Sequence, residues 1–277
     1  MEAIGHFGHG HEGMSWATGG RVAAGTRTGD AHAAAALRRA ARRALAKRAL
    51  DVTLAAVALL ALAVPLALIA LAIKLDSPGP VLYRVRRVGH RGRPLWMLKF
   101  RKMRHDAAGI PLTANGDPRL TRVGALLTRT RLDELPQLWD VLAGRMSIVG
   151  PRPEAPEFVQ RHPDAYREIL SVRPGITGLS QLAFAAEREI LDPEDLVGDY
   201  VERILPQKVS LDLLYVRHGR LATDLAVLGW TAVAILARRQ VAVNRRSGRL
   251  TLRRRPGGAG GGGRPLRRPA GAAPDAV

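Results

Sequence analysis

The chain has 277 residues, of which 43 are Lys or Arg and 24 are Asp or Glu, so its formal net charge is +19 although 47% of its residues are hydrophobic. This length fits one domain of ordinary size with extensions. The absence of cysteine excludes disulfides, thiolate metal sites and cysteine nucleophiles. An aromatic content of 4% argues against a binder of single-stranded nucleic acid built on stacked rings.

The positive charge is concentrated in three segments. Residues 37–48, 84–104 and 245–277 hold six, nine and nine Lys or Arg, and Asp275 is the one acidic residue among them. The rest of the chain is slightly acidic. The charge therefore belongs to particular surfaces, and those surfaces are expected to attract anionic partners.

The strongest physical feature is an apolar stretch that follows a Gly-, Ala- and His-rich tail. Residues 1–36 lack apolar periodicity, which predicts disorder. Residues 52–73 are apolar apart from Thr53, and about 20 such residues span a bilayer. A buried helix of a soluble protein is the alternative, but such a helix would have to be apolar on every face.

Two details predict how the apolar stretch lies in a membrane. Pro65 stands near its middle, where a proline removes a helical hydrogen bond and clashes with the carbonyl of Ala61, at a cost of about 3 kcal/mol in an unbroken helix. Both flanks are basic, and the positive-inside rule opposes the translocation of either flank. We therefore expect a re-entrant helix, broken at Pro65, that enters and leaves by the cytoplasmic face.

The remaining segments predict a small hairpin followed by helices. Residues 81–88 and 94–103 alternate with period two around a Gly-containing turn, which indicates a basic β-hairpin. Asp117 as N-cap and Pro118 at the first helical position predict the start of a helix. Further helices are expected around residues 134–143, 163–170, 193–204 and 207–217. The fold class is thus mainly α with a small β-hairpin, α+β.

The last apolar segment, Leu221–Ala237, is slightly short for a membrane span. We interpret it as a helix lying in the interface, with a second transmembrane helix as the alternative. The predicted organisation is a disordered tail (1–36), a basic flank with the re-entrant helix (37–80), a cytoplasmic catalytic domain that ends in the interfacial helix (81–240), and a disordered basic tail (241–277).

Two adjacent carboxylates, Asp133 and Glu134, are the candidate catalytic residues. One simple alternative is that Asp133 caps a helix and Glu134 complements its dipole. However, Arg129, Arg131 and Arg152 lie nearby in the sequence, the last in a rigid Gly-Pro-Arg-Pro turn. A carboxylate pair in a basic setting suits phosphate chemistry in which one carboxylate binds Mg²⁺ and the other attacks a phosphoryl centre.

Five stretches together resemble the bacterial sugar transferase family, the monotopic polyprenyl-phosphate phosphoglycosyl transferases. They are KRALD, DSPGPVLYRVRRVGHRGRPLWMLKFRKM, DPRLTRVGALL, LDELPQLWDVLAGRMSIVGPRPE and RPGITGLSQL. The resemblance implies a short, membrane-associated monotopic enzyme at the cytoplasmic face of the bacterial inner membrane. It would transfer sugar-1-phosphate from a UDP-sugar to undecaprenyl phosphate and release UMP, as the initiating step of exopolysaccharide or glycoconjugate synthesis.

The resemblance also implies residue roles. Asp133 would be the nucleophile that forms a phosphosugar-aspartyl intermediate, and Glu134 would hold Mg²⁺. Candidate phosphate contacts are Lys99, Arg101, Arg129 and Arg152. The sequence departs from the family at Thr128, where a basic residue is common, and at Arg145, where Asp is usual.

Two other functions compete with this assignment. One is a membrane-tethered basic binding protein, for example for nucleic acid, although the chain has no recognisable nucleic-acid module. The other is a catalytically lapsed family member that serves as a scaffold. The sequence specifies neither the sugar nor the oligomeric state, and a homodimer is compatible with it.

Overall fold

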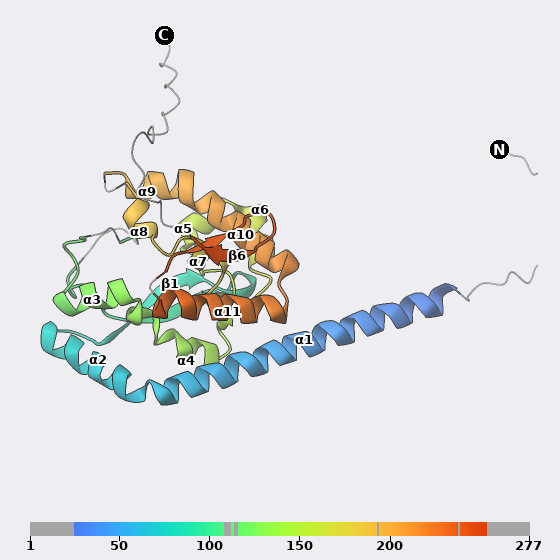
Figure 1. The fold of residues 1–277 in the computed structure, drawn as a ribbon, viewed down its shortest axis with the longest axis horizontal. Helices are drawn as coiled ribbons and strands as arrows, with labels where there is room; N and C mark the ends of the chain where they lie inside the picture. The colour runs from blue at the N-terminus through green and yellow to red at the C-terminus, as the bar shows by residue number, and fades with distance from the viewer. Residues whose placement is uncertain (1–24, 108–111, 114–115, 193, 238, 254–277) are drawn as a thin grey trace, which may run out of the picture. The chain divides into compact units, whose positions relative to one another are not determined.

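The computed structural model describes residues 25–107, 112–113, 116–192, 194–237 and 239–253, and the chain divides into two compact units, residues 1–47 and 48–277. The described part is mostly helical and contains three two-stranded sheets (Figure 1). The predicted α+β class is thus confirmed. The predicted tail of residues 1–36 lies partly outside the described residues, and residues 25–36 belong to a helix instead.

The apolar stretch forms two helices that meet at a bend. Helix α1 (Gly25–Ala61) and helix α2 (Ala63–Asp76) are bent by 62°. Pro65 lies in the first turn of α2, where it cannot donate a hydrogen bond to the carbonyl of Ala61. The helix is interrupted at Leu62, three residues before Pro65, so the assignment of the break to the proline stays a prediction. In the described part of the chain no single helix is long and apolar enough to cross a membrane, whereas this bent pair meets that test by length and composition.

Two polar residues in the C-terminal half of α1 hold this helix against the rest of the second unit. The guanidinium of Arg48 donates to the carbonyls of Val141 and Leu142, at 2.6 and 2.9 Å. The buried carboxylate of Asp51 accepts hydrogen bonds from the hydroxyl of Ser147, at 2.8 Å, and from the backbone N–H of Ile148, at 2.9 Å. Arg48 and Asp51 of the KRALD motif therefore fix the apolar helix to the rest of the second unit.

The predicted hairpin is present as strands β1 (Leu82–Val88) and β2 (Pro94–Phe100), paired antiparallel. Leu95, Met97 and Lys99 are buried on one face of β2, as period-two alternation requires. Leu95 and Met97 pack in a core cluster with residues of α1 and of helix α4 (Gln137–Leu142). This packing fixes the position of Lys99, which lies on the same face of β2.

Helix α3 (Arg122–Thr130) begins later than the sequence predicts. Its N-cap is Thr121, whose hydroxyl accepts from the N–H of Gly124 at 2.9 Å, so the prediction of Asp117 as N-cap is wrong. Asp117 is instead ion-paired with Arg119 at 2.6 Å. A Cβ on Gly124 would lie 1.8 Å from the carbonyl oxygen of Lys102. The glycine thus allows α3 to lie directly against the end of the hairpin.

The second half of the unit packs short helices around two strands and two longer helices. Strand β3 (Ser147–Val149) pairs in parallel with β4 (Gly175–Thr177), and a Cβ on Gly175 would lie 2.1 Å from the backbone nitrogen of Gly150. The helices are α5 (Pro156–Val159), α6 (Pro163–Ile169), α7 (Leu179–Ala183), α8 (Glu187–Ile190), α9 (Leu196–Asp199), the π-helical turn η3 (Tyr200–Ile204), α10 (Leu205–His218) and α11 (Leu221–Leu236). The predicted helices in these regions are confirmed with shifted bounds.

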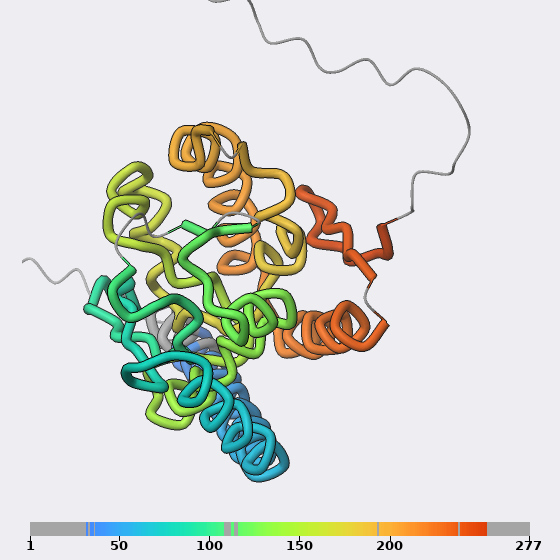
Figure 2. The backbone as a smooth tube through the Cα atoms, turned by 90° about the vertical axis from the view of Figure 1, so that its left-hand side faces the viewer, coloured from blue at the N-terminus to red at the C-terminus, as the bar shows by residue number. Residues whose placement is uncertain are grey.

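A hairpin occupies part of the predicted C-terminal tail. Strands β5 (Val241–Val243) and β6 (Leu250–Leu252) pair antiparallel, and the hairpin lies beside α11 in both ribbon and tube views (Figures 1 and 2). Val241 is buried in a cluster with Val227 of α11 and Leu211 of α10. The prediction of disorder from residue 241 is therefore wrong for residues 241–252, and residues 254–277 lie outside the described residues.

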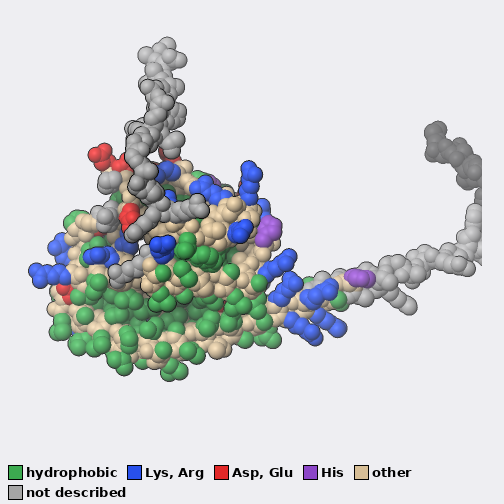
Figure 3. Space-filling view, in the orientation of Figure 1, with side chains coloured by type: hydrophobic (Ala, Val, Ile, Leu, Met, Phe, Trp, Pro, Cys, Tyr) green, Lys and Arg blue, Asp and Glu red, His purple; other side chains and the backbone are tan. Residues whose placement is uncertain are grey.

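Hydrophobic side chains gather on one side of the second unit. Figure 3 shows them along the lower part of the body, over α2 and its neighbours. The exposed large side chains include Val57, Leu60, Val64, Leu68, Leu71 and Leu75 of α1 and α2, and Leu225, Ile235 and Leu236 of α11. An apolar surface of this kind marks an interaction site for a membrane or another protein.

Candidate functional site

The two adjacent carboxylates lie in a short turn between helices. Asp133 and Glu134 belong to the 3-10 turn η2 (Leu132–Glu134), which follows Arg131 in the left-handed conformation, with φ of 59°. Helix α4 starts after Pro136 and has no side-chain cap. Neither carboxylate caps a helix, so the capping alternative does not explain them.

Glu134 is held by two cations from different parts of the chain. Its Oε1 accepts from Lys99 Nζ on β2 at 2.9 Å and from Arg152 Nη2 at 2.7 Å. Arg152 Nη1 lies 3.4 Å from the other carboxylate oxygen. Burial alone would raise the pKa of Glu134, but the charges of Arg152 and Lys99 hold that pKa well below its usual range. Glu134 is therefore ionised and fixed in place.

Asp133 is buried but far less engaged than its neighbour. Among the residues that the structure describes, it accepts no hydrogen bond, and its salt-bridge partner Lys102 lies 3.9 Å from Oδ2. Burial lowers the pKa of Lys102 to about 8, and the charge of Asp133 opposes this shift. Asp133 thus has carboxylate oxygens available for a further ligand. The ammonium group of Lys102 beside it loses its proton near pH 8.

Both carboxylates open into a pocket of about 150 Å³. It is formed by β1, β2, η2, the turn that carries Arg152, the α7–α8 segment and α10. Seven Lys or Arg side chains line it against four Asp or Glu. A site with this excess of positive charge suits a ligand that carries phosphate groups.

One wall of the pocket, formed by Glu154, Glu187, Tyr200 and Lys208, is a polar network. Tyr200 donates its hydroxyl hydrogen to Glu154 Oε1 at 2.7 Å. Lys208 Nζ lies 3.1 Å from the Tyr200 hydroxyl, 3.6 Å from Glu154 and 2.7 Å from Glu187 Oε2. Burial would raise the pKa of Glu154, and Lys208 with the Tyr200 hydroxyl lowers it below its usual value. Both carboxylates in this wall therefore share one ammonium.

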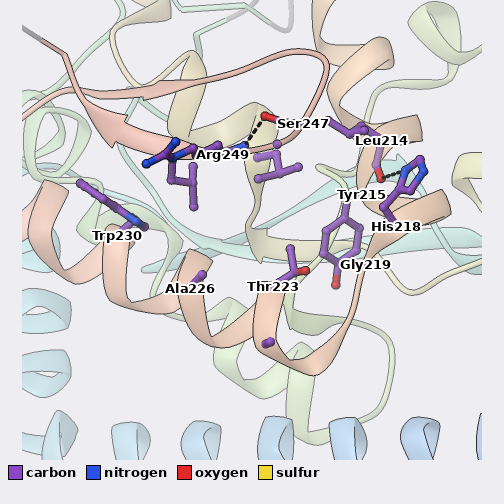
Figure 4. Close-up of a pocket in the computed structure, with 13 residues that line it drawn as sticks. Leu214, Tyr215, His218, Gly219, Thr223, Ala226, Trp230, Ser247 and Arg249 are labelled. Carbon is purple, nitrogen blue, oxygen red and sulfur yellow. Dashed lines mark hydrogen bonds between the residues drawn. The ribbon is translucent and has the colours of Figure 1, made fainter.

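A second pocket, of about 440 Å³, lies between α10, α11 and the β5–β6 hairpin (Figure 4). Tyr215, His218 and Trp230 contribute to its lining, which holds no acidic residue. None of the predicted site residues lines this second pocket. The pocket at Asp133 and Glu134 is therefore the candidate active site.

Comparison with known proteins shows the family to which the chain belongs. Residues 42–238, which include β1 to α11 and every residue of the dyad pocket, match the bacterial sugar transferase family. The chain belongs to the bacterial sugar transferase family. The family predicted from the sequence motifs is confirmed, and with it the prediction of a transferase enzyme.

Three curated relatives illustrate the range of the bacterial sugar transferase family. The exopolysaccharide production protein PSS of Rhizobium leguminosarum bv. phaseoli is 40% identical over 190 residues, which are 62% of this chain and 86% of the relative. The UDP-glucose:undecaprenyl-phosphate glucose-1-phosphate transferase of Escherichia coli (strain K12) is 40% identical over 174 residues, 59% of this chain and 34% of the relative. The UDP-N-acetylgalactosamine-undecaprenyl-phosphate N-acetylgalactosaminephosphotransferase of Aeromonas hydrophila is 39% identical over 182 residues, which are 62% of this chain and 39% of the relative. This sugar transferase thus spans most of the first relative and little more than a third of the other two.

The fold of the transferase brings some predicted site residues together and leaves others apart. Lys99, Asp133, Glu134 and Arg152 all line the pocket. Arg101 does not line it, because its buried guanidinium donates to the carbonyls of Pro78 at 2.6 Å and Ser77 at 2.7 Å. Arg129 is exposed on α3 and does not line it either.

The two residues that differ from the family pattern, Arg145 and Thr128, lie in different parts of the transferase. Arg145 pairs with the fully buried carboxylate of Asp140 at 2.6 Å, so it makes a local salt bridge outside the pocket. Thr128 lines the pocket, and its backbone carbonyl accepts from Arg188 at 2.6 Å. The hydroxyl of Thr128 is buried without a hydrogen-bond partner in the described structure.

Sequence reasoning missed several pocket cations of the transferase. Arg87 and Lys102 lie in the basic segment of residues 84–104, from which only Lys99 and Arg101 were predicted to contact phosphate. The alternation of β1 and the proximity of Lys102 to the end of β2 were available signals. Arg188 carried no such signal, since a four-residue helix has no periodicity to read.

Proposed function

We propose that this chain transfers sugar-1-phosphate from a UDP-sugar to undecaprenyl phosphate and releases UMP, as the first committed step of an exopolysaccharide or glycoconjugate. The observation that carries the proposal is the pairing of a clamped carboxylate, Glu134, with an unengaged one, Asp133, in a pocket with seven cationic side chains. The names of the Escherichia coli and Aeromonas hydrophila relatives, which specify UDP-sugar donors and undecaprenyl phosphate, support this choice of donor and acceptor.

The proposed chemistry has two phosphoryl transfers at Asp133. An Asp133 oxygen attacks the β-phosphorus of the donor, a new P–O bond forms, and the bond between that phosphorus and the bridging oxygen breaks, so that UMP leaves with the electron pair. A phosphate oxygen of the lipid then attacks the same phosphorus and releases the carboxylate. Lys99, Lys102 and Arg152 neutralise the charge on the transferred group in both steps.

A Mg²⁺ ion is part of the proposal. Among the described residues no cluster of three or more His, Cys, Asp or Glu side chains forms a metal cage. Mg²⁺ is commonly held by one or two carboxylates together with substrate phosphates, and this donor set fits a pocket with two adjacent carboxylates. Glu134 would be the ligand, with Oε2 the less engaged oxygen. When bound, the ion would supply further neutralisation of the diphosphate.

We further propose that the enzyme sits on the cytoplasmic face of the membrane. The support is the exposed apolar surface of α2 and its neighbours, the bend between α1 and α2, and basic residues such as Arg38, Arg39, Arg42 and Arg43, which are exposed in the first unit. A basic residue near an anionic bilayer surface contributes about 1 kcal/mol to adhesion. In this arrangement α11 lies in the interface.

The test is UMP release by the purified protein in lipid nanodiscs. The assay contains undecaprenyl phosphate, Mg²⁺ and one member of a panel of UDP-sugars. We expect at least one UDP-sugar to give UMP together with a lipid-linked diphosphate sugar. Failure of every donor, combined with salt-sensitive binding of DNA, would favour the basic binding protein instead.

A further inference from the structure

The lining of the pocket includes a second, partly exposed carboxylate besides the dyad, that of Glu187. Glu187, the first residue of α8, has a side chain that is 21% exposed, and its Oε2 is paired with Lys208 at 2.7 Å. Within the described residues its other oxygen, Oε1, accepts no hydrogen bond. Glu154, the other acidic member of this wall, has a side chain that is only 9% exposed and is bound by Tyr200.

Hydrogen bonds on both sides of Glu187 hold it next to the dyad turn. Arg188, the following residue, donates to the carbonyl of Thr128 at 2.6 Å. Arg131, which precedes the dyad turn, donates to the carbonyl of Ala185. The charge of Glu187 also raises the pKa of Arg152, after the larger effect of Glu134. Glu187 therefore lies beside the cationic end of the pocket, where the phosphates of a donor would bind.

The chemistry of this wall suits a neutral ligand rich in hydroxyl groups. A carboxylate repels phosphate but accepts strong hydrogen bonds from hydroxyl donors. Lys208 holds the Glu187 carboxylate in one position, which reduces the entropy lost when a ligand binds. Phe184, on the same wall, adds an apolar ring to the lining. This combination of a fixed acceptor and an apolar face is typical of small-ligand sites.

We propose that Glu187 accepts a hydrogen bond from a hydroxyl group of the sugar that is transferred, and so helps to select the donor. This inference rests on the proposed function. The ribose of the nucleotide also carries hydroxyl groups. The transferred sugar is the better assignment, because it is attached directly to the phosphorus that Asp133 attacks and because Glu187 adjoins the residues around Asp133.

Substitution of Glu187 tests the proposal through binding as well as turnover. Glu187→Gln keeps the size of the side chain, and Glu187→Ala removes the acceptor. The matched control is Glu189→Gln, an exposed position on the same short helix that does not line the pocket. We expect the Glu187 variants to lower kcat/KM for the preferred UDP-sugar by about tenfold to a hundredfold, the effect of one hydrogen bond to a charged group. UDP affinity should stay unchanged, as should every property of Glu189→Gln. Glu187→Ala should also lower the melting temperature, because it removes a partner of the buried Lys208, and Glu187→Gln should lower it less.

Donor analogues that lack single hydroxyl groups identify the contact. For one deoxy position of the transferred sugar, wild type and Glu187→Gln should have equal kcat/KM, because the interaction is already lost. Equal losses for all analogues, equal weakening of UDP and UDP-sugar binding, or coupling to the ribose hydroxyls would overturn the proposal. If the wild type releases no UMP from any UDP-sugar, the proposed function fails, and that result is distinct from these.

Discussion

Asp51 provides a direct test of how the apolar helix is attached to the catalytic unit. Its buried carboxylate accepts from the Ser147 hydroxyl and from the N–H of Ile148, which belong to β3 and lead into the turn that carries Arg152. Replacement by alanine leaves the N–H of Ile148 without this acceptor, and the Ser147 hydroxyl keeps only the carbonyl of Val149, at 2.9 Å. We therefore predict that Asp51→Ala destabilises the protein and lowers activity through the position of that turn.

The size of the effect follows from the two lost hydrogen bonds. The N–H of Ile148 left without its partner costs about 1–3 kcal/mol, and the Ser147 hydroxyl adds less than this because it still donates to the carbonyl of Val149. In a protein of this size, about 1 kcal/mol corresponds to a melting temperature lower by roughly 2–4 °C. Ser147→Ala removes one donor and leaves the bond from Ile148, so its effect should be smaller.

Thermal unfolding in nanodiscs, together with UMP release, measures both consequences. Val52→Ala is the matched control, since Val52 adjoins Asp51 on α1 and is 37% exposed. In the double variant Asp51→Ala/Ser147→Ala the two losses should not add, because both residues share one hydrogen bond. A melting temperature for Asp51→Ala equal to that of Val52→Ala would refute the docking role.

Three further predictions concern the pocket and its support. Burial lowers the pKa of Lys102 to about 8, so the positive charge of Lys102 is lost as pH rises through that value. The wild-type kcat/KM should therefore fall near pH 8, whereas that of Lys102→Arg should persist to higher pH. Identical pH profiles for the two proteins would contradict a role for the charge. Arg101→Leu should lower the melting temperature without raising KM for the UDP-sugar, because its guanidinium binds backbone carbonyls; a raised KM at unchanged stability would assign it to phosphate after all. Glu134→Ala should require more Mg²⁺ for half-maximal UMP release, and an unchanged titration would remove Glu134 as the ligand.

The sequence predicts those parts of the site that depend on local periodicity. Alternation along β2 places Lys99 on the same face as Leu95 and Met97, and that face is buried against α1 and α4. The same alternation would place Arg101 beside Lys99. The strand ends at Phe100, however, and Arg101 turns to carbonyls near the end of α2. A contact between residues so far apart in the chain has no local signature.

Competing local signals in the sequence explain the other differences between the predicted and the observed structure. Asp117 and Thr121 are both good N-caps, and the hydrogen bond from the N–H of Thr121 to the carbonyl of Lys102 holds the preceding residues outside the helix. The β5–β6 hairpin did have a signal, in which VAV and LTL flank a turn containing Gly248, but the arginines around it suggested a tail. The wall around Glu187 and Lys208 arises from tertiary packing alone.

The central claim is that Asp133 carries the sugar phosphate during the reaction, and intact-protein mass spectrometry tests it most directly. Wild-type protein incubated with Mg²⁺ and a donor UDP-sugar, without lipid acceptor, should gain the mass of one phosphosugar and release one equivalent of UMP. Asp133→Asn should show neither the adduct nor turnover, while it retains UDP binding. An Asp133→Asn protein with unimpaired UMP release, or an adduct located on another residue, would contradict the account.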